Sequence, residues 1–365
     1  MMLREKFPCE EDCVQENTVN VEVIKQIYWK IGDSYSRDIF ENRLMYSLTG
    51  DYRYIGNILG NMETGKKIGK MLDGFKSIYI YGAGIRGKLL VEIFKNKNWK
   101  GFIDLNKNGF YMNYPIYNID AFEFQLGDII LISNSTDSDK IRQHLMEDKN
   151  IPGKSIVLLN DYIRNVSDNI YLDPLYLKNI KMKNKIFFDL GCYDGKDTIR
   201  AIDYFAKEEI QVYAVEPDDS NYLNCVDHLE SYMDKVILQK KGIGCKKEVK
   251  SFMEGGTGSK FSEDGNLLIE IDTIDNMAGS QDVGFIKMDI EGYEEAAIIG
   301  GVETIKRCSP VLAVCVYHKK SDIWKIPLKL LEINPEYQFY LEHYSFGWSD
   351  TVLYAIAPKN QKETL

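Results

Sequence analysis

The sequence predicts an α/β protein with two Rossmann-like doubly wound domains, preceded by a helical segment. At 365 residues the chain is longer than a single core usually supports. β-rich runs alternate with helical patterns twice, on either side of a polar, Pro-containing stretch at residues 165–185. Each alternation holds a glycine loop between a strand and a helix. We therefore expect domains at residues 74–165 and 179–365, after a helical segment at residues 1–73.

The N-terminal segment is predicted to be helical because its apolar residues recur at three-to-four spacing from residue 19 to residue 71. Gly32 and Gly50 mark the breaks between helices. No chemistry-bearing motif falls here. We expect these helices to pack on a neighbouring domain or to join two subunits of a homo-oligomer.

The first predicted domain has a glycine loop typical of dinucleotide binding. The loop reads Gly82-Ala83-Gly84-Ile85-Arg86-Gly87, and Asp104 ends the following strand. Glycines in such a loop let the backbone approach a pyrophosphate at a helix N-terminus, and an acid on the next strand can hold a ribose. The candidate residues for a nucleotide or NAD(P) are Gly82, Gly84, Arg86, Gly87 and Asp104. The alternative is that the glycines serve packing alone.

The second predicted domain has a longer run of strands. Its last two strands are separated only by SFGWSD, which predicts an antiparallel hairpin at one end of a seven-stranded sheet. This architecture is expected for a methyltransferase that uses S-adenosylmethionine. The β-rich runs are KIFFDLG, VYAVEP, VILQ, LLIEI, GFIKMD, PVLAVCVY, QFYLEHY and TVLYAIA.

The glycine loop of this second domain is acidic. Asp189, Asp194 and Asp197 surround its turn, so the loop favours a cation over a pyrophosphate. S-adenosylmethionine carries an ammonium and a sulphonium and no phosphate. Glu216 ends the next strand, where a carboxylate can accept both ribose hydroxyls. The residues predicted to contact the cofactor are Asp189, Gly191, Cys192, Tyr193, Gly195, Glu216, Pro217 and Asp289.

Three further polar residues follow neighbouring strands of the predicted sheet. Asp289 and Glu291 come directly after GFIKM, and His318 ends PVLAVCVYH. Because these strand ends meet at one edge of the sheet, we expect the three side chains to face one small volume. They are the predicted catalytic residues, with His318 as the general base for an alcohol acceptor. The alternative for His318 is a purely structural hydrogen bond.

Composition excludes several classes of function. The formal net charge is −10, without a dense basic stripe, which argues against a nucleic-acid partner. No stretch reaches the roughly eighteen apolar residues that a membrane span needs. The acidic start has no signal-peptide pattern, and seven cysteines without framework spacing indicate reduced thiols. We expect a cytoplasmic protein with no metal site.

The motifs DLGCYDG, AVEP, TIDNM and FIKMDIEGYE, in this order and spacing, resemble the FkbM family of methyltransferases. The resemblance covers about half of the chain. It implies a Rossmann-like fold and O-methylation of sugars, polyketides or related products, with cofactor roles for Asp189, Gly191, Gly195 and Glu216 and an active-site role for Asp289 and Glu291. Where many members carry an acid on the following strand, this chain has Cys315, which favours His318 as the base.

The glycine loop GAGIRG followed by GFIDLN is similar to the nucleotide-binding N-terminal domains of bacterial sugar-modifying acetyltransferases. Together the two resemblances imply an O-methyltransferase in polysaccharide biosynthesis, acting on a saccharide, nucleotide-sugar or related small acceptor. Two alternatives stay open. One is an NAD(P)-dependent oxidoreductase that uses the first glycine loop, and the other is a non-catalytic nucleotide-binding or assembly protein.

Overall fold

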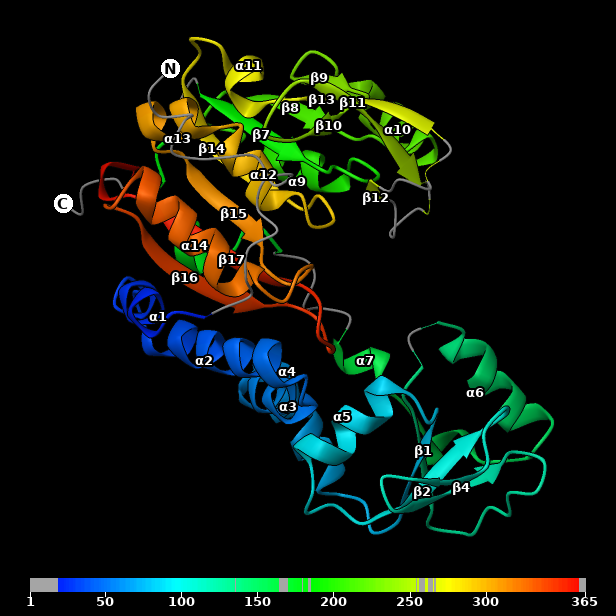
Figure 1. Cartoon of the computed structure of the whole chain (residues 1–365). Helices are drawn as coiled ribbons and strands as arrows, with labels where there is room; N and C mark the ends of the chain where they lie inside the picture. The colour runs from blue at the N-terminus through cyan, green and yellow to red at the C-terminus, as the bar shows by residue number, and fades with distance from the viewer. Residues whose placement is uncertain are drawn as a thin grey trace. The chain divides into compact units, whose positions relative to one another are not determined.

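The structure is a computed structural model, which describes residues 19–134, 136–163, 170–178, 180–182, 185–253, 255, 260–261, 265 and 267–360. The chain divides into two compact units (Figure 1). The larger unit comprises Met1–Phe40, Asn169–Glu342 and Thr351–Leu365, and the smaller comprises Glu41–Asp168 and His343–Asp350.

The division differs from the expected one at the N-terminus, because it falls within a helix of the predicted helical segment. The part of that segment from Glu41 onward belongs to the smaller unit, where helix α3 (Tyr52–Asn61) packs on helix α5 (Ile85–Ile93). A Cβ atom placed on Gly56 or Gly60 would lie 3.4 or 3.5 Å from the Ile93 side chain. The predicted domain edges at Asn165 and Asn179 lie outside the described residues.

The larger unit contains a seven-stranded sheet that ends in the predicted antiparallel arrangement. Its five strands from β15 to β9 are parallel, whereas β17 pairs with β15 in the antiparallel sense. The predicted fold class is thereby confirmed. In spatial order the strands are β16 (Gln338–His343), β17 (Thr351–Ile356), β15 (Val311–Cys315), β14 (Val283–Met288), β7 (Ile186–Leu190), β8 (Gln211–Val215) and β9 (Val236–Gln239).

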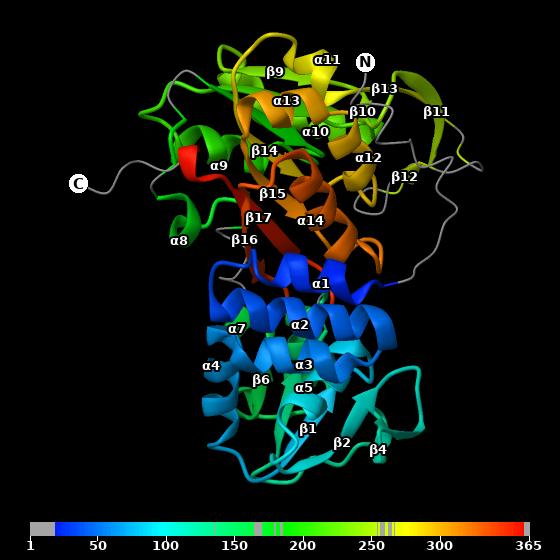
Figure 2. The same ribbon diagram turned by 60° about the vertical axis from the view of Figure 1, so that its left-hand side comes forward.

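The centre of this sheet is fully buried. Every residue of β14, β15 and β17 is buried, as expected for strands covered by helices on both faces. Figures 1 and 2 both show α13 and α14 along these strands. The helices of the larger unit are α1 (Val21–Tyr28), α8 (Pro174–Leu177), α9 (Lys196–Tyr204), α10 (Asp219–Leu229), α11 (Ile274–Ala278), α12 (Glu294–Ile299), α13 (Val302–Cys308) and α14 (Asp322–Ile333).

A second sheet of four strands is inserted between β9 and β14. The LLIEI run, which the sequence places among the strands of the second half, belongs to this sheet and not to the seven-stranded one. Its strand pairs parallel with β10 and antiparallel with β11. In spatial order the strands are β10 (Gly242–Ile243), β13 (Leu267–Asp272), β11 (Glu248–Met253) and β12 (Lys260–Phe261).

The smaller unit is built on a six-stranded sheet. All its strand pairs are parallel except that of β3 with β4, and the first glycine loop joins β1 to α5. In spatial order the strands are β3 (Gly109–Tyr111), β4 (Tyr114–Asn118), β2 (Trp99–Asp104), β1 (Ile78–Tyr81), β5 (Ile129–Ile132) and β6 (Ile156–Leu158). The other helices are α2 (Ser34–Thr49), in which the division between the units falls, α4 (Glu63–Leu72), α6 (Ser138–Glu147) and α7 (Asn160–Ile163).

The structure bears on two expectations, the absence of a membrane span and the reduced state of the cysteines. Among the described residues, no helix is long and apolar enough to cross a membrane. Cys245 is disulfide-bonded, so the expectation of reduced thiols throughout is wrong for this residue. The described cysteines that are free are Cys192, Cys225, Cys308 and Cys315.

Candidate active site

The second glycine loop passes directly against the end of strand β14. Gly191 has φ +79°, and a Cβ atom there would lie 1.9 Å from the backbone oxygen of Asp289. The Asp289 N–H donates to the Leu190 carbonyl at 3.0 Å. Only glycine permits this approach. The backbones of the glycine loop and of the DIEG segment are therefore in direct contact.

Asp189 points into this structure and not toward solvent. Its carboxylate accepts a hydrogen bond from the Thr198 hydroxyl at 2.6 Å and lies 3.0 Å from the ammonium of Lys287. Lys287 also donates to the Gly191 carbonyl at 2.5 Å. Burial lowers the pKa of this lysine, but the neighbouring carboxylates, Asp189 first, raise it above its ordinary value. The buried pair holds the loop in place.

The loop is less acidic than its sequence indicates, because each of its aspartates has a cationic partner. Asp194 lies 2.5 Å from the Lys196 ammonium, and Asp197 lies 2.7 Å from the Arg200 guanidinium. Both partners follow on the same turn or helix. The Coulomb argument for a cationic ligand is correspondingly weaker than the residue types alone suggest.

Glu216 ends β8 beside the same loop. Its carboxylate accepts the backbone N–H groups of Tyr193 and Asp218, both at 3.0 Å. Burial is the main reason that the pKa of Glu216 is raised to about 7. The Asn221 side chain also hydrogen-bonds this carboxylate, so three of its four lone pairs are engaged within the protein.

The other residues predicted around the loop differ in exposure. Tyr193 is 45% exposed, with φ +53°, whereas Cys192 is buried with its sulphur 3.5 Å from that of Cys225. Pro217 is half-buried, and Gly195 has φ +79° at the start of α9. A ligand at the loop would therefore meet the Tyr193 side chain and the Cys192 backbone, but not the Cys192 thiol.

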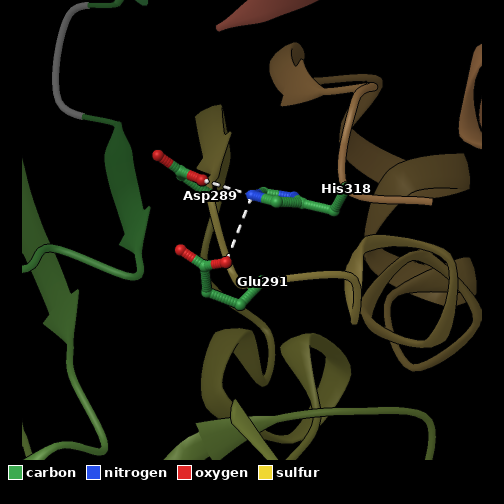
Figure 3. Close-up of side chains that lie close together, drawn as sticks. All are labelled: Asp289, Glu291 and His318. Atoms are coloured by element: carbon green, nitrogen blue, oxygen red, sulfur yellow. Dashed lines mark ion pairs between the residues drawn. The ribbon is translucent and has the colours of Figure 1, made fainter. Parts of the chain in front are cut away.

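Asp289, Glu291 and His318 lie together, as strand order predicts (Figure 3). The first two follow β14, and His318 follows β15. His318 Nε2 lies 3.3 Å from Asp289 Oδ1 and 3.6 Å from Glu291 Oε2. The His318 side chain is only 9% exposed, whereas that of Glu291 is 41% exposed. The cluster is thus reached from the Glu291 side.

Glu294 and Asp322 surround the other side of the imidazole. Glu294 is fully buried, with its Oε1 2.9 Å from His318 Nδ1. Burial lowers the pKa of His318, but Glu294, Asp289 and Glu291 outweigh burial and raise it to about 9. Burial, with Glu294 next, raises the pKa of Asp322 to about 7. With a pKa of about 9, the imidazole is mostly protonated at pH 7.

Sequence reasoning missed Tyr171, which completes the cluster. Its hydroxyl donates to Asp289 Oδ2 at 2.6 Å and lies 3.6 Å from the Cys315 sulphur. The ring lies under the Lys287 ammonium, 4.9 Å from it. Tyr171 precedes the domain and has φ +67°, so no strand or helix pattern points to it. Lys287 was detectable, because a lysine within an otherwise apolar buried strand needs a buried partner.

In the glycine loop of the smaller unit, the polar groups predicted to bind a nucleotide form hydrogen bonds within the unit. Both oxygens of Asp104 accept backbone N–H groups, one from Ala83 at 2.9 Å and the other from Asn106 and Lys107. Arg86 donates to the Asn160 side chain at 2.8 Å. The predicted ribose and phosphate contacts are therefore already engaged within the unit.

The fold of the larger unit is that of a Rossmann-like methyltransferase domain. Residues 189–346 match the family model of the Methyltransferase FkbM domain. This part of the chain therefore has the sequence features of an FkbM methyltransferase domain, which supports methyl transfer as its activity.

The solved structures that the chain resembles are distant in sequence. A methyltransferase FkbM from Methylobacillus flagellatus KT is 17% identical, with 88% of this chain and 99% of that chain covered and a TM-score of 0.46. Aeropyrum pernix fibrillarin, in complex with natively bound S-adenosyl-L-methionine, is 12% identical over 51% and 72% of the two chains, with a TM-score of 0.31. No curated protein sequence matches the chain.

Proposed function

We propose that the larger unit transfers a methyl group from S-adenosylmethionine to a hydroxyl of a saccharide, nucleotide-sugar or related small acceptor. One observation carries this proposal: the glycine loop, Glu216 and the Asp289 cluster converge at the carboxyl ends of β7, β8, β14 and β15. Ligands of open α/β sheets bind at this edge, where the strand order reverses between β7 and β14.

The cofactor half of the site is proposed to lie along the loop. Glu216 is proposed to bind the ribose hydroxyls, with one lone pair left beside its bonds to Tyr193, Asp218 and Asn221. Tyr193 offers an exposed ring beside it. Gly191 and Gly195 let the loop pack closely on the protein, because a Cβ atom there would lie 1.9 Å from the Asp289 carbonyl and 3.0 Å from the Leu229 side chain, respectively. Asp189 contributes indirectly, because it fixes the loop through Lys287 and Thr198. It is a positioning residue in this proposal.

The acceptor half is proposed to lie at Asp289, Glu291 and His318. Methyl transfer from a sulphonium is an in-line displacement, so the acceptor oxygen has to be held in line with the methyl carbon. An alcohol must also lose its proton. His318 Nε2 faces the two carboxylates. In the absence of a bound cation, the neutral form of His318, which a pKa of about 9 makes the minor form at pH 7, is the group assigned as general base. His318→Gln should lower kcat by roughly 100-fold while leaving cofactor affinity nearly unchanged.

Calorimetric titration of the full chain with S-adenosylhomocysteine tests the cofactor half without knowledge of the acceptor. Glu216→Ala should weaken binding by roughly 1 to 3 kcal/mol, the usual range for lost hydrogen bonds to a carboxylate. Glu336→Ala, which removes an exposed surface acid before β16, is the matched control and should not change the affinity. Equal affinities of wild type and Glu216→Ala would remove Glu216 from the site.

A second candidate function is nucleotide binding by the smaller unit, and one observation favours it. Packing explains two of the loop glycines: Gly82 has φ +102°, and a Cβ on Gly87 would lie 2.6 Å from the Gly82 carbonyl. A Cβ on Gly84 would meet nothing within 4 Å. The fold of this unit therefore does not explain Gly84, whereas backbone approach to a phosphate would. Thermal-shift measurements with NAD⁺ and UDP test this candidate.

A further inference from the structure

We propose that Asp289, Glu291 and His318 form the binding site of one divalent metal cation, at the acceptor end of the proposed active site. This departs from the expectation of no metal that the sequence supports. Binding itself is argued from the geometry of these three residues, whereas the role of the cation in catalysis rests on the proposed function.

The spacing of the three ligand atoms matches a single cation. Bonds of about 2.1 Å from a metal to nitrogen and oxygen place neighbouring ligand atoms about 3.0 Å apart in octahedral geometry and about 3.4 Å apart in tetrahedral geometry. His318 Nε2 lies 3.3 Å from Asp289 Oδ1 and 3.6 Å from Glu291 Oε2. All three ligand atoms lie within 4.8 Å of one another. The two separations from His318 Nε2 are therefore close to those of ligand atoms around one cation.

The atoms that face each other lack hydrogen bonds. Neither His318 Nε2 nor Asp289 Oδ1 has a hydrogen-bond partner among the described residues, although both atoms are buried. The His318 side chain is more than nine-tenths buried and its Nε2 points between the two carboxylates (Figure 3). Buried polar atoms are nearly always satisfied, and a bound ion is one explanation for exceptions.

Two neighbouring residues, Glu294 and Tyr171, contact the proposed metal ligands and orient them. Glu294 Oε1 lies 2.9 Å from Nδ1 of His318, on the far side of the ring from the proposed cation. The Tyr171 hydroxyl donates to Asp289 Oδ2 and leaves Oδ1 directed into the site. A carboxylate behind a ligating imidazole, and a donor behind a ligating carboxylate, are the common outer-shell arrangement of metal sites.

The local charge also favours a cation. Three carboxylates, those of Asp289, Glu291 and Glu294, lie within 4 Å of one imidazole. Even a protonated imidazole balances only one of them. The buried Lys287 ammonium interacts with Asp289 only at longer range, because its ion pair is with Asp189. A divalent ion would supply the missing positive charge where burial makes unpaired carboxylates costly.

The ligand set indicates the class of metal. Carboxylates suit Mg²⁺ and Mn²⁺, and imidazole suits first-row transition metals, so one nitrogen and two oxygens favour a first-row divalent ion such as Mn²⁺. The half-exposed Glu291 leaves coordination positions open to an acceptor oxygen. A cation bound there would lower the pKa of the acceptor hydroxyl, as it does for water.

With the cation bound, His318 acts as a ligand, and the hydroxyl proton leaves to solvent. The acceptor oxygen then forms its bond to the methyl carbon while the carbon–sulphur bond breaks. Its electron pair stays on sulphur, so the products are the methyl ether and neutral S-adenosylhomocysteine. No oxidant or reductant is required.

Electron paramagnetic resonance of free Mn²⁺, titrated against the full chain, tests the site without cofactor or acceptor. We expect one Mn²⁺ per chain. Glu291→Gln changes a half-exposed side chain, so it should leave the fold intact while raising Kd at least 10-fold. Glu294→Gln should raise Kd about 10- to 100-fold, the usual effect of losing an outer-shell partner.

Glu295→Gln is the matched control. It removes the next carboxylate in the chain, which lies 3.9 Å from Lys325, and should leave the Kd for Mn²⁺ within 2-fold of wild type. Absence of Mn²⁺ binding to the wild type would overturn the metal site, as would equal Kd values for wild type and Glu291→Gln. The proposed cofactor site is tested separately by S-adenosylhomocysteine binding, so neither Mn²⁺ result bears on it.

Discussion

Replacement of Gly191 by alanine should uncouple the glycine loop from the DIEG segment. The new Cβ would lie 1.9 Å from the Asp289 carbonyl oxygen, whereas such contacts are essentially never shorter than 3.0 Å. The two backbones would have to separate by about 1.1 Å. We expect overpacking to cost about 1 to 3 kcal/mol, in addition to about 1 to 2 kcal/mol for a side chain at left-handed φ.

Gly279→Ala isolates the effect of the close contact. Gly279 also has a left-handed φ, +53°, but a Cβ there meets nothing within 4 Å. It lies in the same unit, at the end of α11. Urea unfolding of both variants should therefore show a larger loss of stability for Gly191→Ala, by about 1 to 3 kcal/mol.

The same pair of variants should differ in ligand binding. Gly191→Ala moves the loop away from Asp289 and should weaken S-adenosylhomocysteine binding more than 10-fold in calorimetry, whereas Gly279→Ala should not change it. If both variants lost equal stability and kept wild-type affinity, the close approach of loop and strand end would have no part in the site.

Three further predictions follow from buried groups and from the first loop. Asp189→Asn should destabilise the protein by about 3 to 5 kcal/mol in urea unfolding, because Lys287 keeps a buried charge without its partner, and an unchanged midpoint would contradict that pairing. Burial, then Arg43, lowers the pKa of His343 to about 3, so the folded state binds fewer protons than the unfolded state below pH 6.5. Stability should be complete above pH 6.5 and fall by up to about 1.4 kcal/mol per pH unit toward pH 3, a slope that His343→Asn should reduce. Gly84→Val should abolish any thermal shift by nucleotides without lowering the melting temperature of the free protein, since a side chain there blocks only a ligand.

The fold of the larger unit was largely predictable because its central strands are buried on both faces and read as apolar runs. The pairing of the strands inserted between β9 and β14 was not predictable. The LLIEI run has the same residue types as a strand of the main sheet, yet it pairs with β11, whose alternating polar sequence gave no strong strand signal. Which strands pair depends on contacts distant in sequence, which periodicity does not encode.

The candidate site was predictable where residues stand at strand ends. Asp289 and His318 each end or follow a strand, so the parallel topology alone brings them together. Tyr171 and Glu294 lacked such a signal. Tyr171 precedes the predicted domain, and Glu294 lies three residues beyond Glu291, at the start of α12. Their roles depend on side-chain directions within the folded unit, which no spacing in the sequence specifies.

A crystal structure of the full chain with S-adenosylhomocysteine is the most direct test of the proposed active site. We predict that the ribose hydroxyls bind Glu216 and that the sulphur atom faces the volume between Asp289 and His318. An adenosine bound instead at the Gly82–Gly87 loop, or a sulphur directed away from His318, would contradict it.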